Sequence, residues 1–339
     1  MPNIYDVARL ADVSIAAVSI VMRSPETKRV GAAKRARILK AASELGYRPS
    51  SIARALSEGS TKIIGLLIPM RQSIFANYFV AEVLSGVQTC AAQNGYDLMI
   101  YSHLTENGRV TQRELSKSRY VDGMIVLNTR VSSKHDMDGT IHDLRATGLP
   151  FVMVNGYSGK EDINYVGVDD QRTGQMATEY LLRQGHKRLA ALCGSRRSPI
   201  SSQFLAGVRL GLKGQAGKVK ELLLGYSEYD TATTQHIVEG WLALRQPPDA
   251  ILAMDDHMVP VIYRAAAHKG LRIGKDIAIV SRGNPVFAES LEPKLTTIAI
   301  SGQEIGAQAA SLLIQTLDSA SPSVQKIVLT STLIASASA

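Results

Sequence analysis

The sequence predicts a small all-α head in a helix-turn-helix arrangement, followed by a larger α/β core of two lobes, each built on a doubly wound parallel sheet. Three observations predict this fold class. The chain has 339 residues, more than one typical domain needs. Short helical patterns fill its first 60 residues. Apolar runs then alternate with helical stretches through the rest of the chain.

The first segment has the pattern of three short helices. Apolar residues recur at helical spacing over residues 4–11. Asp12 then tolerates a left-handed backbone, and Ser14 is suited to N-cap a second helix, which we expect over 15–22. A third helix is expected over 32–45. Two short helices joined by a tight turn, with a third packed behind them, form the helix-turn-helix arrangement.

The positive charge of the chain is concentrated in this first segment. Residues 1–62 contain eleven Lys and Arg against five Asp and Glu, so they hold +6 of the formal net charge of +8. Such an asymmetry indicates a polyanionic partner, either nucleic acid or an anionic membrane surface. The same residues contain no Trp or Phe, which a membrane-binding amphipathic helix would need. The sequence therefore favours nucleic acid.

The rest of the chain has the pattern of buried parallel strands. Runs rich in Val, Ile and Leu that are separated by helices are typical of parallel sheets covered on both faces. Ligands of such sheets bind at the carboxyl ends of the strands, which in a two-lobed core means the cleft between the lobes. Strands are expected at residues 63–68, 96–101, 123–127, 151–154, 165–168, 188–192, 250–253, 277–280 and 327–334.

Nothing in the sequence indicates a membrane protein or a secreted one. No apolar run reaches 18 residues, and the first residues have neither the basic nor the apolar region of a signal peptide. We therefore expect a soluble, cytoplasmic protein without a membrane partner.

No metal, cofactor or catalytic site is indicated either. Cys90 and Cys193 are far apart and lie in no CxxC motif. The run Asp255, Asp256 and His257 suggests a metal site, but consecutive helical residues point about 100° apart, so capping of a helix start is preferred. The phosphate-binding Gly-Lys-Ser/Thr loop and Gly-x-Ser-x-Gly are absent. We expect no cofactor and no enzymatic activity.

The amino-terminal motif resembles that of the LacI/GalR family of bacterial transcription regulators, and the resemblance extends through the core. The head carries Asp6-Val7-Ala8, Ala11, Val13-Ser14, Val18-Ser19, Glu44-Leu45-Gly46-Tyr47-Arg48-Pro49 and Ala53-Arg54-Ala55-Leu56. The core carries Gly167-Val168-Asp169, Gly174, Gly185-His186, Ala206-Gly207 and Leu295-Thr296-Thr297.

The resemblance implies a domain plan and a core like that of a periplasmic sugar-binding protein. The effector-binding and dimerisation core would consist of two subdomains, preceded by the DNA-binding head and a hinge helix. The expected boundaries are 1–49 for the helix-turn-helix domain, 50–60 for the hinge helix and 61–339 for the core, with an N-subdomain of about 61–160 and 290–318 and a C-subdomain of about 161–289 and 319–339.

The resemblance also implies which residues bind DNA. The second helix would lie in the major groove, and Leu56 of the hinge helix would enter the minor groove and bend the duplex. The family usually has Arg where this chain has Ile20, which can make only an apolar contact, for instance with a thymine methyl group. We therefore expect an atypical operator. The implied DNA-binding residues are Ser14, Ile15, Ala16, Ser19, Ile20, Arg23, Ala53 and Leu56.

The implied effector site departs from the family at three polar positions. Phe204 replaces an Arg, Asp255 replaces an Asn, and residues 281–284 replace Gly-Phe-Asp-Asp. An aromatic, glycosylated or acidic small molecule is then as plausible as a plain sugar, and loss of effector binding is a further alternative. The implied effector-binding residues are Ser73, Phe75, Asn155, Arg196, Phe204, Tyr229, Asp255, Arg282 and Asn284.

Together these features predict a sequence-specific DNA-binding transcription regulator, a repressor whose operator affinity is modulated by a small molecule between the lobes. The expected partners are a pseudopalindromic double-stranded operator, a sugar or related effector and a second copy of the chain. One alternative is a regulator that works without an effector or with a protein co-regulator. Another is a cytoplasmic sugar-binding signalling module.

Overall fold

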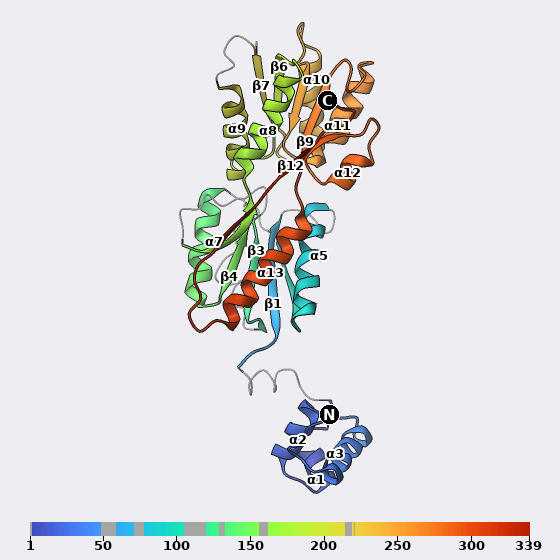
Figure 1. Cartoon of the computed structure of the whole chain (residues 1–339), viewed down its shortest axis with the longest axis vertical. Helices are drawn as coiled ribbons and strands as arrows, with labels where there is room; N and C mark the ends of the chain where they lie inside the picture. The colour runs from blue at the N-terminus through green and yellow to red at the C-terminus, as the bar shows by residue number, and fades with distance from the viewer. Residues whose placement is uncertain are drawn as a thin grey trace. The chain divides into compact units, whose positions relative to one another are not determined.

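The computed structural model describes residues 2–48, 59–70, 78–104, 120–128, 133–155, 162–213, 219 and 221–339. The chain forms two compact units, Met1–Lys62 and Ile63–Ala339 (Figure 1). The first unit is the head, and the second is the core. Each is described by itself.

The head is made of three helices, and local capping explains where they begin. Asn3 caps α1 in a reciprocal capping box with Asp6. Asp12 ends α1 with φ +50°, and the Ser14 hydroxyl accepts a hydrogen bond from Ala17 N at 3.2 Å to start the next helix. The predicted turn residues and helix positions are confirmed. The helices are α1 (Ile4–Ala11), α2 (Ile15–Arg23) and α3 (Ala32–Glu44).

Small apolar side chains form the core of the head. Val18 and Val21 of α2 are fully buried, and each contributes about 1.5–3 kcal/mol by its removal from water. This buried face fixes which side of α2 is turned outward. The other buried members are Val7, Ala8, Ala11, Val30, Ile38, Ala41 and Ala42.

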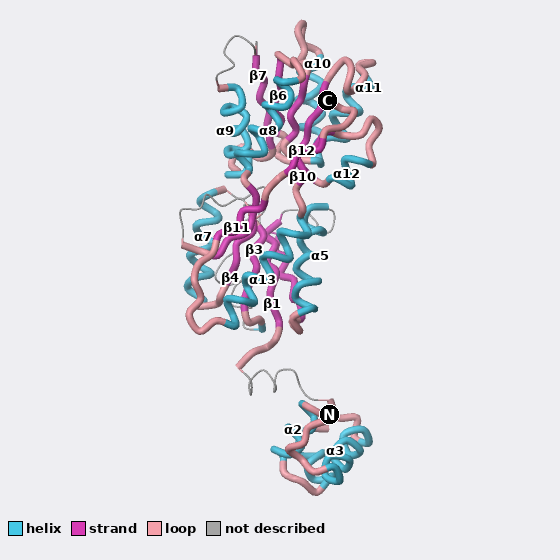
Figure 2. Tube along the Cα trace, in the orientation of Figure 1, coloured by secondary structure: helices cyan, strands magenta, loops and turns pink. Residues whose placement is uncertain are grey.

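The first sheet of the core is entirely parallel and has the strand order β11-β5-β4-β3-β1-β2. Figure 2 draws the strands of the core in magenta and its helices in cyan. Helices cover both of its faces, as the sequence predicted. We call this sheet and its helices the N-terminal lobe. Its strands are β1 (Ile63–Met70), β2 (Asp97–Leu104), β3 (Gly123–Leu127), β4 (Phe151–Val154), β5 (Asn164–Val168) and β11 (Lys326–Leu329), and its helices are α5 (Tyr78–Gln93), α7 (Lys134–Thr147) and α13 (Gly302–Asp318).

The second sheet has the order β12-β10-β9-β8-β6-β7, and only β12 is antiparallel to its neighbour. Helices cover this sheet on both faces too. We call it, with its helices, the C-terminal lobe. Its strands are β6 (Arg188–Cys193), β7 (Glu221–Tyr226), β8 (Ala250–Ala253), β9 (Ala278–Gly283), β10 (Thr296–Ala299) and β12 (Thr332–Ile334), and its helices are α8 (Asp170–Arg183), α9 (Pro199–Leu212), α10 (Thr231–Leu242), η3 (Asp256–Met258), α11 (Val259–His268) and α12 (Pro285–Glu289).

Glycines allow the paired helices of each lobe to touch. A side chain on Gly86 of α5 would collide with the backbone of α13 at Gln303. In the same way, a side chain on Gly207 of α9 would collide with the backbone of α8 at Gln171. Both helix pairs therefore pack backbone against backbone, which gives each lobe a rigid face.

The expected subdomain boundaries are wrong at three strands. Asn164–Val168 and Lys326–Leu329 were expected in the C-subdomain but belong to the first sheet, and Thr296–Ala299 was expected in the N-subdomain but belongs to the second. The single strand expected over 327–334 is two strands, one in each sheet. The reason is that the chain crosses between the lobes three times: from β5 to α8, from β10 to α13 and from β11 to β12.

Candidate functional site

The outward face of α2 carries the residues predicted to bind DNA. Ile15 and Ala16 are exposed, and so are Ser14 and Arg23 at the two ends of the helix. Ser19 and Ile20 are half-buried, and Ile20 packs against the core of the head. The structure therefore brings six of the eight predicted residues to one helix and its cap. Ala53 and Leu56 lie outside the described residues.

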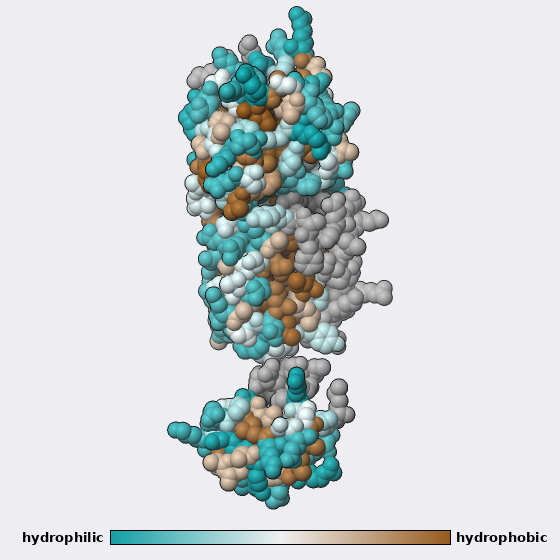
Figure 3. Space-filling model, turned by 90° about the vertical axis from the view of Figure 1, so that its right-hand side faces the viewer, coloured by the Kyte–Doolittle hydropathy of each residue, from teal (hydrophilic) through white to brown (hydrophobic). Residues whose placement is uncertain are grey.

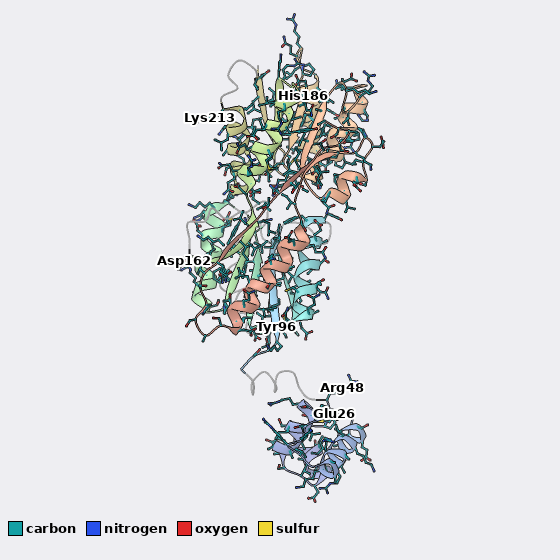
Figure 4. The ribbon with its side chains drawn as sticks, viewed as in Figure 1. Glu26, Arg48, Tyr96, Asp162, His186 and Lys213 are labelled. Carbon is teal, nitrogen blue, oxygen red and sulfur yellow. The ribbon has the colours of Figure 1, made fainter. Side chains whose placement is uncertain are left out.

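Exposed basic side chains follow α2 in the chain and continue onto α3. Lys28, Arg29 and Lys34 are exposed. Arg35 is held by a hydrogen bond from its Nη1 to Thr27 O at 2.9 Å. Figure 4 draws the side chains of the head and labels Arg48, which is exposed near its end. A surface of this kind can neutralise phosphates without reading bases.

A second site is indicated at the carboxyl ends of the first sheet. Asn128 follows β3 and Asn155 follows β4. The N–H of Asn128 donates to Val154 O at 2.9 Å, and the N–H of Asn155 donates to Val166 O at 3.0 Å, so the two asparagines lie on neighbouring strands in register. Tyr96, just before β2, marks the opposite, amino end of this sheet in Figure 4.

Both asparagines carry buried polar atoms that have no hydrogen-bond partner among the residues that the structure describes. Asn128 is 5% exposed and Asn155 is 4% exposed. Both amide atoms of Asn128 and Oδ1 of Asn155 lack a hydrogen-bond partner, as do the hydroxyls of Ser198 and Ser201 at the start of α9. Buried polar groups without partners are costly and rare. Their presence at strand ends suits a ligand that bonds to amides and hydroxyls.

A buried ion pair lies at the first crossing between the lobes. Arg282, near the end of β9, places Nη2 3.0 Å from Oδ1 of Asp170, the first residue of α8. The distance is that of an ion pair, but the alignment is not that of a hydrogen bond, and Arg282 Nε also lacks a partner. Burial raises the pKa of the Asp170 carboxyl, the charge of Arg282 opposes that rise, and Asp169 adds to it.

Polar side-chain contacts join the lobes. Asn284 Nδ2 donates to Glu82 Oε1 of α5 at 2.6 Å, and Arg197 Nη2 donates to Asp136 Oδ2 of α7 at 3.2 Å. Burial raises the pKa of Glu82, against hydrogen bonds from Asn284 and from the backbone of Gly302, which lower it. Both contacts join a helix of the N-terminal lobe to a residue of the C-terminal lobe.

Several predicted effector residues have other places in the structure. Phe204 is 1% exposed and lies in the core of the C-terminal lobe, so the expectation that it contacts the effector is wrong for this structure. Tyr229 packs its ring against Gly194. Arg196 lies over the ring of Tyr226, 4.6 Å from its centre. Ser73 and Phe75 lie outside the described residues.

The acidic run after β8 caps a helix, as predicted. The carboxylate of Asp255 accepts from His257 N at 3.1 Å at the start of η3. Asp256 accepts from Ser281 Oγ at 3.0 Å and from Asn284 N at 2.6 Å, and its carboxylate fills the space that a side chain at Gly283 would need. Within the described ranges, no group of three potential metal ligands is found.

Sequence reasoning missed Asn128, Asp170 and Glu82. Asn128 directly follows an apolar run, so the rule that selected Asn155 would have found it. The roles of Asp170 and Glu82 depend on packing between distant segments, and no local signal marks them.

An apolar groove lies on the N-terminal lobe, along α5 and the edge strand β2. It is lined by Ala81, Leu84, Ser85, Gln88, Leu98 and Ile100. The α5 side of the lobe faces the viewer in Figure 3, where a brown apolar strip is visible. Among the described helices, none is long and apolar enough to cross a membrane.

Comparisons with known proteins agree with this architecture. The family "Bacterial regulatory proteins, lacI family" matches residues 3–50, and "Periplasmic binding protein-like domain" matches residues 178–339. HTH-type transcriptional repressor CytR of Escherichia coli (strain K12) is 29% identical over 310 residues, 91% of this chain and 88% of that protein. Catabolite control protein A of Priestia megaterium is 28% identical over 92% of this chain and 91% of its own length.

Solved structures share the fold over the whole chain. The lac repressor dimer bound to operator and the anti-inducer ONPF has a TM-score of 0.83 at 22% identity, covering 99% of this chain and 98% of the other. The regulator CelR in complex with cellobiose has a TM-score of 0.73 at 24% identity, covering 100% of both. With the head motif, the two-lobed core and both family matches in agreement, the chain belongs to the LacI family of bacterial regulatory proteins.

Proposed function

We propose that this protein is a sequence-specific DNA-binding transcription regulator, a repressor whose operator affinity is modulated by a small molecule bound between the lobes of the core. One observation carries the proposal. A basic three-helix head that turns a helix face outward belongs to the same chain as a core whose strand ends carry buried, unpartnered polar atoms. The first part suits a polyanion, and the second suits a small ligand.

On DNA, α2 would lie in the major groove and the exposed basic side chains of the head would contact phosphates. Ser14 and Ser19 would add phosphate contacts. Ala53 and Leu56 would belong to a hinge helix that enters the minor groove at the centre of the operator. Phosphate contacts would supply affinity, and α2 would supply sequence preference.

The effector would be an uncharged molecule rich in hydroxyl or amide groups, a class that includes sugars. The carboxylates of Asp136, Asp170 and Glu82 already interact with side chains of the chain. Among the described residues, the buried polar atoms without a hydrogen-bond partner are neutral apart from those of the paired Asp170 and Arg282, and they include both amide atoms of Asn128 and Oδ1 of Asn155. This pattern favours a neutral ligand over the acidic one that the sequence left open.

We further propose a homodimer that uses the groove of α5 and β2. Its lining is mainly apolar, and a second copy that presents the same face would cover both grooves in a two-fold arrangement. Such a dimer would place two heads on a pseudopalindromic operator.

Selection from a random duplex library tests the main proposal. The full chain should enrich one pseudopalindromic sequence. If about six phosphates are neutralised, log K should fall with log[salt] with a slope near −5. Enrichment of no sequence at any salt concentration would contradict the proposal.

The effector is tested separately by thermal unfolding of the full chain against sugars, glycosides and small acids. A ligand at 100 times its dissociation constant should stabilise the protein by about 2.7 kcal/mol. A response only to acids would contradict the neutral-ligand proposal. No response from any compound would favour a regulator without an effector or with a protein co-regulator.

A further inference from the structure

The outward face of α2 is unusually apolar for a helix expected to read DNA. Val18 and Val21 are turned into the core of the head, which leaves Ile15, Ala16 and Ser19 facing outward. The side chain of Ile15 is 41% exposed. Ile15 is not among the residues that form the core of the head or pack against it.

The same face lacks the side chains that read most base edges. Guanine is read by Arg or Lys and adenine by Asn or Gln, each through two hydrogen bonds. Residues 15–22 contain none of these four types, and the first basic residue is Arg23 at the end of the helix. The distinct apolar feature in the major groove is the 5-methyl group of thymine. Isoleucine and alanine side chains can contact that group.

We infer that Ile15 and Ile20 recognise thymine methyl groups in each operator half-site, so that much of the sequence preference of α2 is apolar. This inference rests on the proposed DNA-binding function. Ile20 is half-buried against the core of the head, so its outer surface is held in place. Both side chains are β-branched and therefore stiff, and little rotamer freedom is lost on contact. Ala16 between them lets the helix approach the bases closely.

Charge on the head supports a nucleic-acid occupant for this apolar face. Residues 1–62 hold a net charge of +6, and Lys28, Arg29 and Lys34 are exposed around the helices. Attraction between these side chains and phosphates does not depend on sequence. The isoleucines would then convert a general attraction to DNA into a preference for thymine at defined positions.

The experiment uses one duplex, selected by the full chain, that is synthesised with either thymine or deoxyuridine at each position of the half-site. Deoxyuridine pairs as thymine does and lacks only the methyl group. Removal of each contacted methyl group should weaken binding about fourfold. For Ile15→Ala, binding to the thymine duplex should fall, and at the position that Ile15 contacts the two duplexes should bind equally. If the effect of the methyl group disappears when Ile15 is shortened, the two groups are in direct contact, whereas a general change in the DNA would affect both proteins equally.

A matched control is Leu39→Ala on α3, which removes a similarly exposed apolar side chain, 38% exposed, from a helix that does not read bases in this scheme. It should keep the full difference between thymine and deoxyuridine. Far-ultraviolet circular dichroism of Ile20→Ala verifies that the head is folded. A folded variant should lose the difference in binding between thymine and deoxyuridine at a second position.

Equal binding of the thymine and deoxyuridine duplexes by the unmodified protein would overturn the inference and leave the regulator function standing. Selection of no duplex would instead overturn the DNA-binding function itself.

Discussion

The guanidinium of Arg282 lies 3.0 Å from the carboxylate of Asp170, and the two side chains are only 10% and 3% exposed. Arg282 comes from β9 and Asp170 from the first turn of α8, directly after the chain leaves the N-terminal lobe. The pair therefore links the first crossing between the lobes to the sheet of the C-terminal lobe.

Loss of Arg282 should leave a buried, unpaired carboxylate. We expect Arg282→Met to destabilise the C-terminal lobe by about 3–5 kcal/mol at pH 7.5. Trp241 of α10 is the only tryptophan in the chain, so urea unfolding followed by its fluorescence reports on this lobe. As a control, Arg272→Met removes an exposed ion pair with Asp276 and should barely change the unfolding midpoint.

The cost of Arg282→Met should also depend on pH. Burial raises the pKa of Asp170 above its ordinary value of 3.8, so the folded state holds a proton more tightly than the unfolded state. Stability linked to this group is therefore greatest below pH 3.8 and is lost as the pH rises through the folded pKa. Without Arg282 that pKa rises further, and the destabilisation should be smaller at pH 5 than at pH 7.5. An equal loss at both pH values would contradict this account.

Asn284→Asp should weaken the contact between the lobes. The new carboxylate can still cap α12 by accepting from Phe287 N, but it cannot donate to Glu82 and repels it. Burial raises the pKa of Glu82, so this carboxylate takes up a proton at a higher pH than an exposed glutamate does. Its protonation in acid should relieve the repulsion. We expect the melting temperature to fall by about 2–4 °C for each kcal/mol lost, with a larger drop at pH 7.5 than at pH 5. Asn284→Ser, which keeps a cap without adding a charge, should show a smaller drop that depends less on pH, because it only removes the hydrogen bond that lowers the pKa of Glu82.

Asn128→Leu should stabilise the unliganded core and abolish its response to effector. The amide that it removes is buried without hydrogen-bond partners, and its replacement by an apolar group of similar size should gain about 1 kcal/mol. Thermal unfolding with and without the ligand panel measures both effects. Asn94→Leu, at an exposed asparagine that donates to Cys90 O, should gain no stability and keep the response. A destabilised Asn128→Leu variant that still responds would refute the assignment.

Ser85→Arg should separate the dimer into monomers. Ser85 is exposed on α5 and lines the apolar groove, so a charge there should prevent a second copy from covering it without harming the lobe. Sedimentation velocity measures the change. Gln93→Arg adds the same charge to the same helix outside the groove lining and should remain dimeric. A dimeric Ser85→Arg variant would rule out this face.

Strands with strong apolar runs could be predicted from the sequence, and two weaker strands could not. Glu221–Tyr226 is a largely half-exposed edge strand whose apolar run is only three leucines long, and Thr296–Ala299 begins with two threonines, so neither has the longer apolar run of a buried strand. Assignment of Asn164–Val168 to the wrong lobe has a different cause. Apolar content predicts a strand, but its partner in the sheet depends on long-range pairing.

The candidate sites were predictable to different degrees. The exposed face of α2 follows from helical periodicity and a capping serine, both of which are local. Asn155 follows from its position after an apolar run. The proximity of Asp170 to Arg282 could not be predicted, because it requires α8 to pack beside β9. Phe204 occupies an expected ligand position in sequence, yet the core of the lobe takes up its ring.

The three crossings between the lobes restrict how the core can move. A single connecting segment would let one lobe rotate about any axis relative to the other, and two segments would define one hinge axis. With three segments, after β5, after β10 and between β11 and β12, any movement of one lobe relative to the other has to bend all three together. A ligand that closes the cleft by a small angle therefore has to turn one lobe as a whole relative to the other, and every residue of that lobe turns with it.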